Sequence, residues 1–262
     1  MSRHEYFATR TADSVERERL TAAETANDDK SRRHLLELGV GPGWSCLEVG
    51  AGCGSITRWL AERVGRDGRV VAIDVDTRFL QEINQPNVEI RRLDVLRDAL
   101  EDSTYDLVHS RLLLMHLPDP QLVVRRMIQA TRLGGWIMIE EADFASFRGA
   151  DSSNPLSESF AEKFRAISDA AGRLKLFDPY FGRRVRALLE REGLSEVGSE
   201  GAVRLVHGGE AEAHAYRLTL PALVKADVCS ENDSLELQKA LSDPGFTFIG
   251  LTMFSAWGRR AV

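Results

Sequence analysis

A glycine-rich segment at residues 48–54 carries the residue types best suited to hold a ligand. It reads Glu-Val-Gly-Ala-Gly-Cys-Gly, follows a short apolar run and precedes a stretch with helical periodicity. Glycine lets the backbone turn tightly and approach a bound group, because no Cβ stands in the way. Dinucleotide-binding loops are similar, but the third small residue of their fingerprint would fall at Ser55, whereas this loop is spaced G-x-G-x-G. The segment predicts a cofactor site.

Two aspartates end the apolar runs that follow this loop. Asp74 closes the run Val-Val-Ala-Ile-Asp, and Asp94 closes residues 88–94. A carboxylate at the end of the second strand can accept hydrogen bonds from both hydroxyls of a ribose. Asp94 could accept one from the exocyclic amine of adenine, and the Val95 N–H could reach a ring nitrogen. These contacts predict an adenosyl group without telling NAD from S-adenosylmethionine.

The charge of Glu48, just ahead of the loop, separates these two cofactors. A carboxylate there would repel a pyrophosphate and would attract an ammonium or sulfonium group. The chain also lacks a Y-x-x-x-K pair. Both observations favour S-adenosylmethionine, and they count against a nicotinamide-dependent oxidoreductase or a non-enzymatic nucleotide-binding module.

The elements around these residues alternate between strand and helix patterns. Such alternation indicates a parallel sheet with helices on both faces. A helical region at 13–39 precedes the sheet, and Asn27-Asp28-Asp29 predicts a break within it. The expected strands are 46–49, 70–74, 88–94, 105–110 and 136–141, with helices at 56–64 and 122–131.

The second half of the chain has a different organisation. Two helices are expected within 144–181, a further helix at 183–192, and residues 209–242 look helical, while 194–207 and 246–257 are expected to be strands. Inserted helices at the carboxyl edge of the strands would form a lid over a substrate. We therefore expect one domain, made of a lid (1–39), a cofactor-binding core (40–145), cap insertions (146–182 and 209–245) and closing strands (183–208 and 246–262).

Five segments together resemble the motif series of class I S-adenosylmethionine-dependent methyltransferases. They read L-E-V-G-A-G-C-G, V-V-A-I-D, R-R-L-D-V, Y-D-L-V-H-S-R and L-G-G-W, in the family's order. The resemblance covers residues 31–145 well and the closing elements loosely. It implies an α/β fold with a Rossmann-like, seven-stranded, mostly parallel sheet, helices on both faces and an antiparallel last strand.

The resemblance also implies a set of cofactor-binding residues. Glu48 and the loop glycines would surround the methionine end, and the residues after the fourth strand would line the loop beside the reactive methyl group. Cys53 departs from the more common Thr or Ser. The implied set is Glu48, Gly50, Ala51, Gly52, Gly54, Asp74, Val75, Asp94, Val95, Ser110 and Arg111.

Residues for the acceptor side are less clearly marked. His116 follows the fourth strand and has a pKa range that suits a general base, although it could instead pack under the cofactor loop. Glu141 is a second catalytic candidate, and with Asp143 it could either orient an acceptor or cap the chain. Tyr6 and Tyr180 could line the acceptor pocket or pack as lid residues. His116, Tyr6, Asp143 and Tyr180 form the expected substrate-binding set.

The expected function is transfer of a methyl group from S-adenosylmethionine to a small-molecule acceptor, leaving S-adenosylhomocysteine. Inserted helices would build a closed acceptor pocket, and no nucleic-acid module is visible. Two alternatives keep the same cofactor: a cyclisation or rearrangement, and methylation of a peptide. The cofactor residues do not identify the acceptor.

Composition limits the partners and the location. A net charge of -6 and an isoelectric point near 5.6 argue against a general nucleic-acid binder. The three cysteines have no metal-ligand spacing, so neither a metal site nor a disulfide framework is expected. The chain has no apolar run of signal-peptide or membrane-spanning type. We expect a cytoplasmic protein, either a monomer or a homodimer.

Overall fold

The computed structural model describes residues 13–261, which fall into two compact units. The first, here called the sheet unit, contains residues 27–141, 183–200 and 254–261. The second, here called the helical unit, contains residues 13–26, 142–182 and 201–253. Helix α1 (Asp13–Glu37) and strands β5 (Thr131–Asp143), β7 (Ser195–His207) and β8 (Thr247–Arg259) have residues in both.

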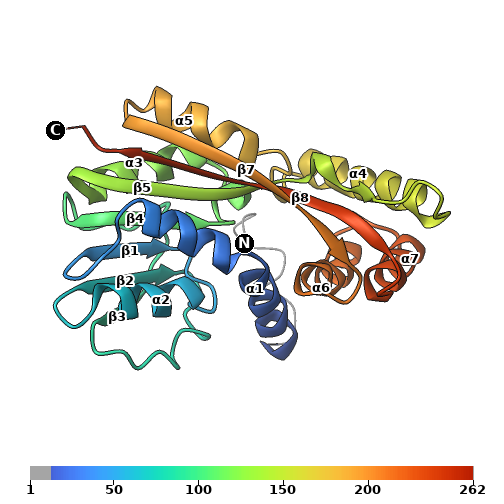
Figure 1. The fold of residues 1–262 in the computed structure, drawn as a ribbon, viewed down its shortest axis with the longest axis horizontal. Coiled ribbons are helices and arrows are strands. Elements are labelled where there is room, and N and C mark those ends of the chain that lie inside the picture. The colour runs from blue at the N-terminus through green and yellow to red at the C-terminus, as the bar shows by residue number, and fades with distance from the viewer. Residues whose placement is uncertain (1–12, 262) are drawn as a thin grey trace. The chain divides into compact units, whose positions relative to one another are not determined.

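The sheet unit is built on parallel strands in the order β3-β2-β1-β4-β5, with β8 next to β5 and β7 beside β8 (Figure 1). Gly134 and Gly135 exchange backbone hydrogen bonds with Arg260, so β8 runs antiparallel to β5. The predicted Rossmann-like sheet with an antiparallel last strand is confirmed. The other four strands of this sheet are β1 (Ser45–Val49), β2 (Arg69–Asp74), β3 (Val88–Arg92) and β4 (Tyr105–Arg111).

Helices cover both faces of this sheet. Helix α2 (Ser55–Val64) connects β1 to β2, whereas α3 (Pro120–Ala130) connects β4 to β5 on the other side of the strand order. Right-handed crossovers in opposite directions place these two helices on opposite faces. On the α2 face, Leu35 of α1 joins Ile56 and Leu60 in one buried cluster. Helix α5 (Val185–Arg191) precedes β7.

The helical unit has its own hydrophobic core, which is rich in aromatic residues. Helices α4 (Leu156–Arg173), α6 (Ala211–Lys225) and α7 (Glu231–Ser242) surround it. Phe147 stacks on Phe164 with ring centroids 4.3 Å apart. Of the two helices expected within 144–181, α4 is the long one, and a single turn at Phe144–Ser146 precedes the two-residue strand β6 (Arg148–Gly149), which pairs antiparallel with β8.

Helix α1 contradicts one detail of the sequence analysis. The break predicted at residues 27–29 is absent, and the helix runs without interruption from Asp13 to Glu37. Asp28 is tolerated inside the helix because its carboxylate accepts hydrogen bonds from Arg32, one turn later, and from Ser55 on α2. Within residues 13–261, no helix is both long and apolar enough to cross a membrane.

Candidate functional site

The glycine loop has a backbone that side chains would disturb. Gly50, Gly52 and Gly54 have φ angles of 76°, 59° and 81°, all in the left-handed region that favours glycine. At Gly54 a Cβ would also lie 2.6 Å from Ile83 Cδ1. The N–H groups of Gly50 and Ala51 donate to the Ile73 carbonyl at 2.9 and 3.2 Å. These bonds fix the start of the loop against β2.

Asp74 lies at the rim of this loop, at the end of β2. Its carboxylate accepts hydrogen bonds from the Gly52 N–H at 3.1 Å and from the Asp76 N–H at 3.0 Å. Burial raises the pKa of Asp74, and the backbone donors partly offset this effect. The adjacent Val75 side chain is 52% exposed. The edge therefore presents a carboxylate beside an open apolar surface, which suits a ribose joined to a flat base.

Asp94 is brought to the same edge as Asp74, since the Leu93 N–H donates to the Asp74 carbonyl at 2.9 Å. Its carboxylate accepts from the Leu96 N–H at 3.0 Å and lies 3.5 Å from Arg97 Nε. Val95 is buried. Asp94 thus shapes a local turn, and its carboxylate is about one-third exposed.

Glu48 lies on β1, just ahead of the glycine loop, and is buried within the sheet. Its carboxylate accepts a hydrogen bond from the Thr57 hydroxyl on α2, and Oε1 lies 3.9 Å from His109 Nδ1. Burial raises the pKa of Glu48, while His109 and Thr57 lower it. The side chain is 5% exposed. Glu48 therefore links β1 to α2 through the Thr57 hydroxyl.

His109 continues this buried network across the sheet. Its Nε2 lies 3.2 Å from Glu140 Oε2, and the Ser255 hydroxyl donates to Glu140 at 2.6 Å. Although burial raises it, the hydrogen bond and charge of His109 lower the pKa of Glu140 to about 2. His109 is fully buried and belongs to the core of the sheet unit.

Ser110 follows His109 and is paired in register with Val49, the residue before the loop. Its side chain is fully buried, and its Oγ has no hydrogen-bond partner among the described residues. A buried hydroxyl without a partner is costly. A polar ligand group beside β1 and β4 would remove that cost, so Ser110 fits the predicted cofactor set.

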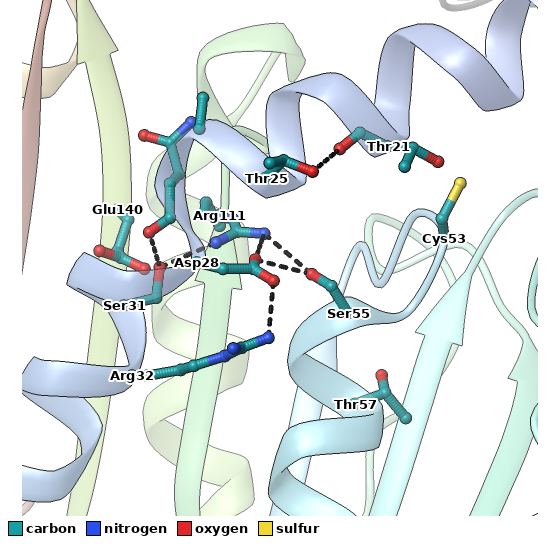
Figure 2. Close-up of polar contacts among 12 residues, drawn as sticks. Thr21, Thr25, Asp28, Ser31, Arg32, Cys53, Ser55, Thr57, Arg111 and Glu140 are labelled. Carbon is teal, nitrogen blue, oxygen red and sulfur yellow. Dashed lines mark hydrogen bonds and ion pairs between the residues drawn. The ribbon is translucent and has the colours of Figure 1, made fainter. Parts of the chain in front are cut away.

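Arg111 turns toward α1 and α2, as Figure 2 shows. Its Nη2 lies 2.9 Å from Asp28 Oδ1 and 3.3 Å from Ser55 Oγ, and its Nη1 donates to Ser31 Oγ at 2.9 Å. Asp28 was not among the predicted site residues, because Asn27-Asp28-Asp29 resembles a helix break. The spacing of Asp28 and Leu35 was the available signal, since positions seven apart share a helix face.

Glu141 has contacts that match the capping alternative. Its carboxylate is fully buried and accepts hydrogen bonds from the backbone N–H groups of Leu113, Leu114 and Met115, at 3.1, 2.6 and 3.3 Å. Burial raises its pKa to about 8, and these donors oppose the shift. Of the two alternatives, these contacts favour capping, because Glu141 holds the one-turn helix Leu114–His116 onto the sheet. His116 ends that helix and is half-buried.

The other expected acceptor residues lie in or near the helical unit. Asp143 is 3% exposed, and its carboxylate caps the turn Phe144–Ser146 by accepting from the Ala145 N–H at 3.0 Å. The Tyr180 hydroxyl donates to Asp169 Oδ1 on α4 at 3.0 Å. Tyr6 lies outside the described residues. Capping is therefore the observed role of Asp143, in place of an open acceptor-facing position.

Comparison with known proteins places this geometry in a family. Residues 47–139 match the family model of a methyltransferase domain. Methyltransferase str2 of Strobilurus tenacellus is 32% identical over 191 residues, which cover 71% of this chain and 66% of the relative. Methyltransferase str3 of the same organism is 28% identical over 166 residues, or 62% of this chain and 57% of the relative. The match thus spans less than two thirds of either relative.

A solved structure shares the fold. Phosphoethanolamine N-methyltransferase 2 of Haemonchus contortus, in complex with phosphomonomethylethanolamine and S-adenosylhomocysteine, superposes with a TM-score of 0.62 at 16% identity. The superposition covers 100% of this chain and 61% of that one. The glycine loop, the acids at the strand ends and the matched segment lead to one assignment: residues 47–139 form a methyltransferase domain, similar to those of the class I S-adenosylmethionine-dependent methyltransferases.

Proposed function

We propose that this protein binds S-adenosylmethionine and transfers its methyl group to a small-molecule acceptor. One observation carries the proposal: three left-handed glycines form a loop after β1, and the half-buried Asp74 carboxylate holds its centre through the Gly52 N–H. A tight loop beside a carboxylate suits an adenosyl ligand. The match of residues 47–139 to a methyltransferase domain and a fold relative that holds a small molecule with S-adenosylhomocysteine support it.

Each residue of the cofactor set has a proposed part. Asp74 accepts hydrogen bonds from the ribose hydroxyls, Asp94 and the Val95 N–H hold the adenine, and Val75 packs against the base. Ser110 gives its unpartnered hydroxyl to the methionine end, next to Gly50, Ala51, Gly52 and Gly54. Glu48 on β1 and Arg111 on β4 support the loop through their contacts with α2 and α1. The bound cofactor supplies a methyl group already activated on a positively charged sulfur.

The remaining work of the protein is to align the acceptor and to remove its proton. Alignment with exclusion of water accounts for much of the rate in such transfers. We assign the general base to His116, because it follows β4 and is half-buried, whereas Glu141 is committed to three backbone donors. Asp143 and Tyr180 are proposed to shape the acceptor side through the turn and the α4 contact that they hold.

We also propose that the protein works in the cytoplasm on a small molecule, without nucleic acid, as a monomer or a homodimer. Cys46, Cys53 and Cys229 form no disulfide, which supports a reducing compartment. The net charge of -6 disfavours a phosphate backbone as partner.

Titration calorimetry with S-adenosylmethionine, S-adenosylhomocysteine and NAD tests the cofactor assignment. We expect micromolar-range binding of the first two and none of NAD. Asp74→Ala should weaken both adenosyl ligands at least tenfold, because it removes the ribose acceptor and the support of Gly52. Asp67→Asn is the matched control, since it removes an exposed carboxylate from the turn before β2.

Binding of NAD without a response to the sulfur ligands would overturn the cofactor assignment. A screen of small hydroxyl- and amine-bearing compounds, read out by S-adenosylhomocysteine release, tests the transfer. Tight cofactor binding, no turnover on any small acceptor, and turnover on peptides or a rearranged substrate would favour the alternatives of peptide methylation or cyclisation.

A further inference from the structure

Asp28 on α1 forms an ion pair with Arg111 and a hydrogen bond with Ser55, the residue that follows the glycine loop. Asp28 Oδ1 accepts hydrogen bonds from Arg111 Nη2 at 2.9 Å and from the Ser55 hydroxyl at 2.8 Å (Figure 2). Asp28 Oδ2 accepts from Arg32 at 2.9 Å. The side chains of Asp28 and Arg111 are 12% and 9% exposed, so the pair is largely removed from water. Partly buried pairs of this kind are screened little by salt.

The position of Ser55 gives this contact its importance. Ser55 is the first residue of α2 and directly follows Gly54, the last glycine of the loop. The start of the loop is fixed by the Ile73 carbonyl and its centre by Asp74. At the end of the loop, Asp28 accepts a hydrogen bond from the Ser55 side chain. Asp28 lies on α1, which is distant from the loop in the sequence. The loop therefore keeps its shape with help from α1.

The pair also sets the charge beside the loop. Arg111 is close enough to Glu48 and Glu140 for its charge to stabilise both carboxylates, and Asp28 acts on Glu48 in the opposite direction. Arg111 is thus a buried cation near the strand that leads into the loop, and Asp28 is the carboxylate that neutralises it at hydrogen-bond distance. Without Asp28, a positive charge would remain next to the loop.

We propose that Asp28 is a positioning residue for the cofactor site, which fixes Ser55 at the end of the loop and neutralises Arg111 so that the loop accepts a positively charged sulfur. The proposal rests on the proposed function. It distinguishes two ligands that differ in little besides charge: S-adenosylmethionine carries a sulfonium, and S-adenosylhomocysteine carries a neutral thioether. An unpaired Arg111 would repel the first and leave the second almost unaffected.

The ratio of the two dissociation constants is the readout. We expect Asp28→Asn to weaken both ligands slightly, because the amide oxygen of Asn is a weaker acceptor for the Ser55 hydroxyl than a carboxylate is. We expect it to weaken S-adenosylmethionine further, by a factor on the order of five, because a negative charge that balances Arg111 is lost. A second change, Arg111→Met, should restore the wild-type ratio in the Asp28→Asn background. Asp29→Asn is the control, because it removes a neighbouring carboxylate from the exposed side of α1.

Equal weakening of both ligands would show that Asp28 serves folding alone, and unchanged binding would show that it does not serve the site; either result overturns the proposal. If Asp28→Asn does not fold, Arg111→Met is compared with the double variant. Asp28 then keeps its negative charge and its pair with Arg32 but no longer faces Arg111, and the single variant should favour S-adenosylmethionine more than the double variant does. Failure of the wild-type protein to bind either ligand would instead count against the proposed function.

Discussion

At the scale of single residues, Glu141 combines full burial with three backbone donors, and burial raises its pKa from an ordinary 4.5 to about 8. The folded protein therefore holds this proton more tightly than the unfolded chain. Between pH 4.5 and pH 8 the folded state binds more protons, so the free energy of unfolding falls as the pH rises, and no further loss occurs above about 8.

Replacing Glu141 by Gln should flatten that dependence. The amide does not ionise, and its oxygen can still accept backbone hydrogen bonds. Urea unfolding of the wild type should lose up to about 1.4 kcal/mol per pH unit more than the variant between roughly pH 5.5 and 7.5. Glu62→Gln, at an exposed position on α2, should follow the wild-type curve. Parallel curves for wild type and Glu141→Gln would contradict the raised pKa.

Gly54 is constrained both by its positive φ angle and by the side chains packed around it, and substitutions can separate the two effects. Gly54→Ala adds strain at a φ of 81° and a Cβ that would lie 2.6 and 2.9 Å from side-chain atoms of Ile83 and Leu80. Gly43→Ala is the matched control, because its φ is 80° and a Cβ there would meet nothing within 4 Å. We expect a loss of about 1 kcal/mol at Gly43 and about 2–4 kcal/mol at Gly54, measured by urea unfolding. Similar losses at both sites would mean that the contacts with Ile83 and Leu80 carry no cost.

At the scale of elements, α1 is held to the sheet unit by a polar contact and an apolar one. Asp28 supplies the first through Arg111, and Leu35 supplies the second by packing against α2. The two positions lie seven residues apart and so share one face of the helix. This face explains why a helix with polar residues in its middle needs no break at residues 27–29.

Leu35→Ala tests the apolar half of this attachment. Leu35 is fully buried, whereas the neighbouring Leu36 is 47% exposed. Truncation of a buried leucine costs about 2–5 kcal/mol, and at the exposed neighbour we expect less than about 0.5 kcal/mol. Thermal and urea unfolding of both variants provide the measurement. Equal small losses would mean that the C-terminal half of α1 is not packed on the sheet unit.

At the scale of the whole molecule, sequence patterns predicted those elements whose structure depends mainly on their own local sequence. The buried run before Asp74 and the alternation of strand and helix predicted the parallel sheet, because a strand buried on both faces is continuously apolar. The glycine spacing predicted the loop for the same local reason. The long strands of the second half were also predictable from their patterns.

Other features could not be predicted, because they depend on partners far along the chain. Asp28 is stabilised within α1 by its contact with Arg111, which lies 83 residues later in the chain. Glu141 can cap the turn after β4 only because β4 and β5 are neighbours in the sheet, which places that turn beside the end of β5. The burial of Glu48 depends on Thr57 of α2 and His109 of β4. Side-chain direction at a strand end is set by packing, which a one-dimensional pattern does not contain.

The two compact units, each with its own hydrophobic cluster, lead to a prediction about cooperativity. A ligand that binds only the folded sheet unit stabilises it by mass action, about 2.7 kcal/mol at a concentration 100 times Kd. In hydrogen exchange, the slowest amides of β1, β2 and β4 should then exchange about a hundredfold more slowly with S-adenosylhomocysteine. Amides of α4 and α7 should keep their rates, because these helices pack on the separate aromatic core. Asp74→Ala is the control, since it should remove the protection of the strands. Equal slowing of α4 and α7 would mean that the two units unfold together, through the helix and the three long strands that have residues in both.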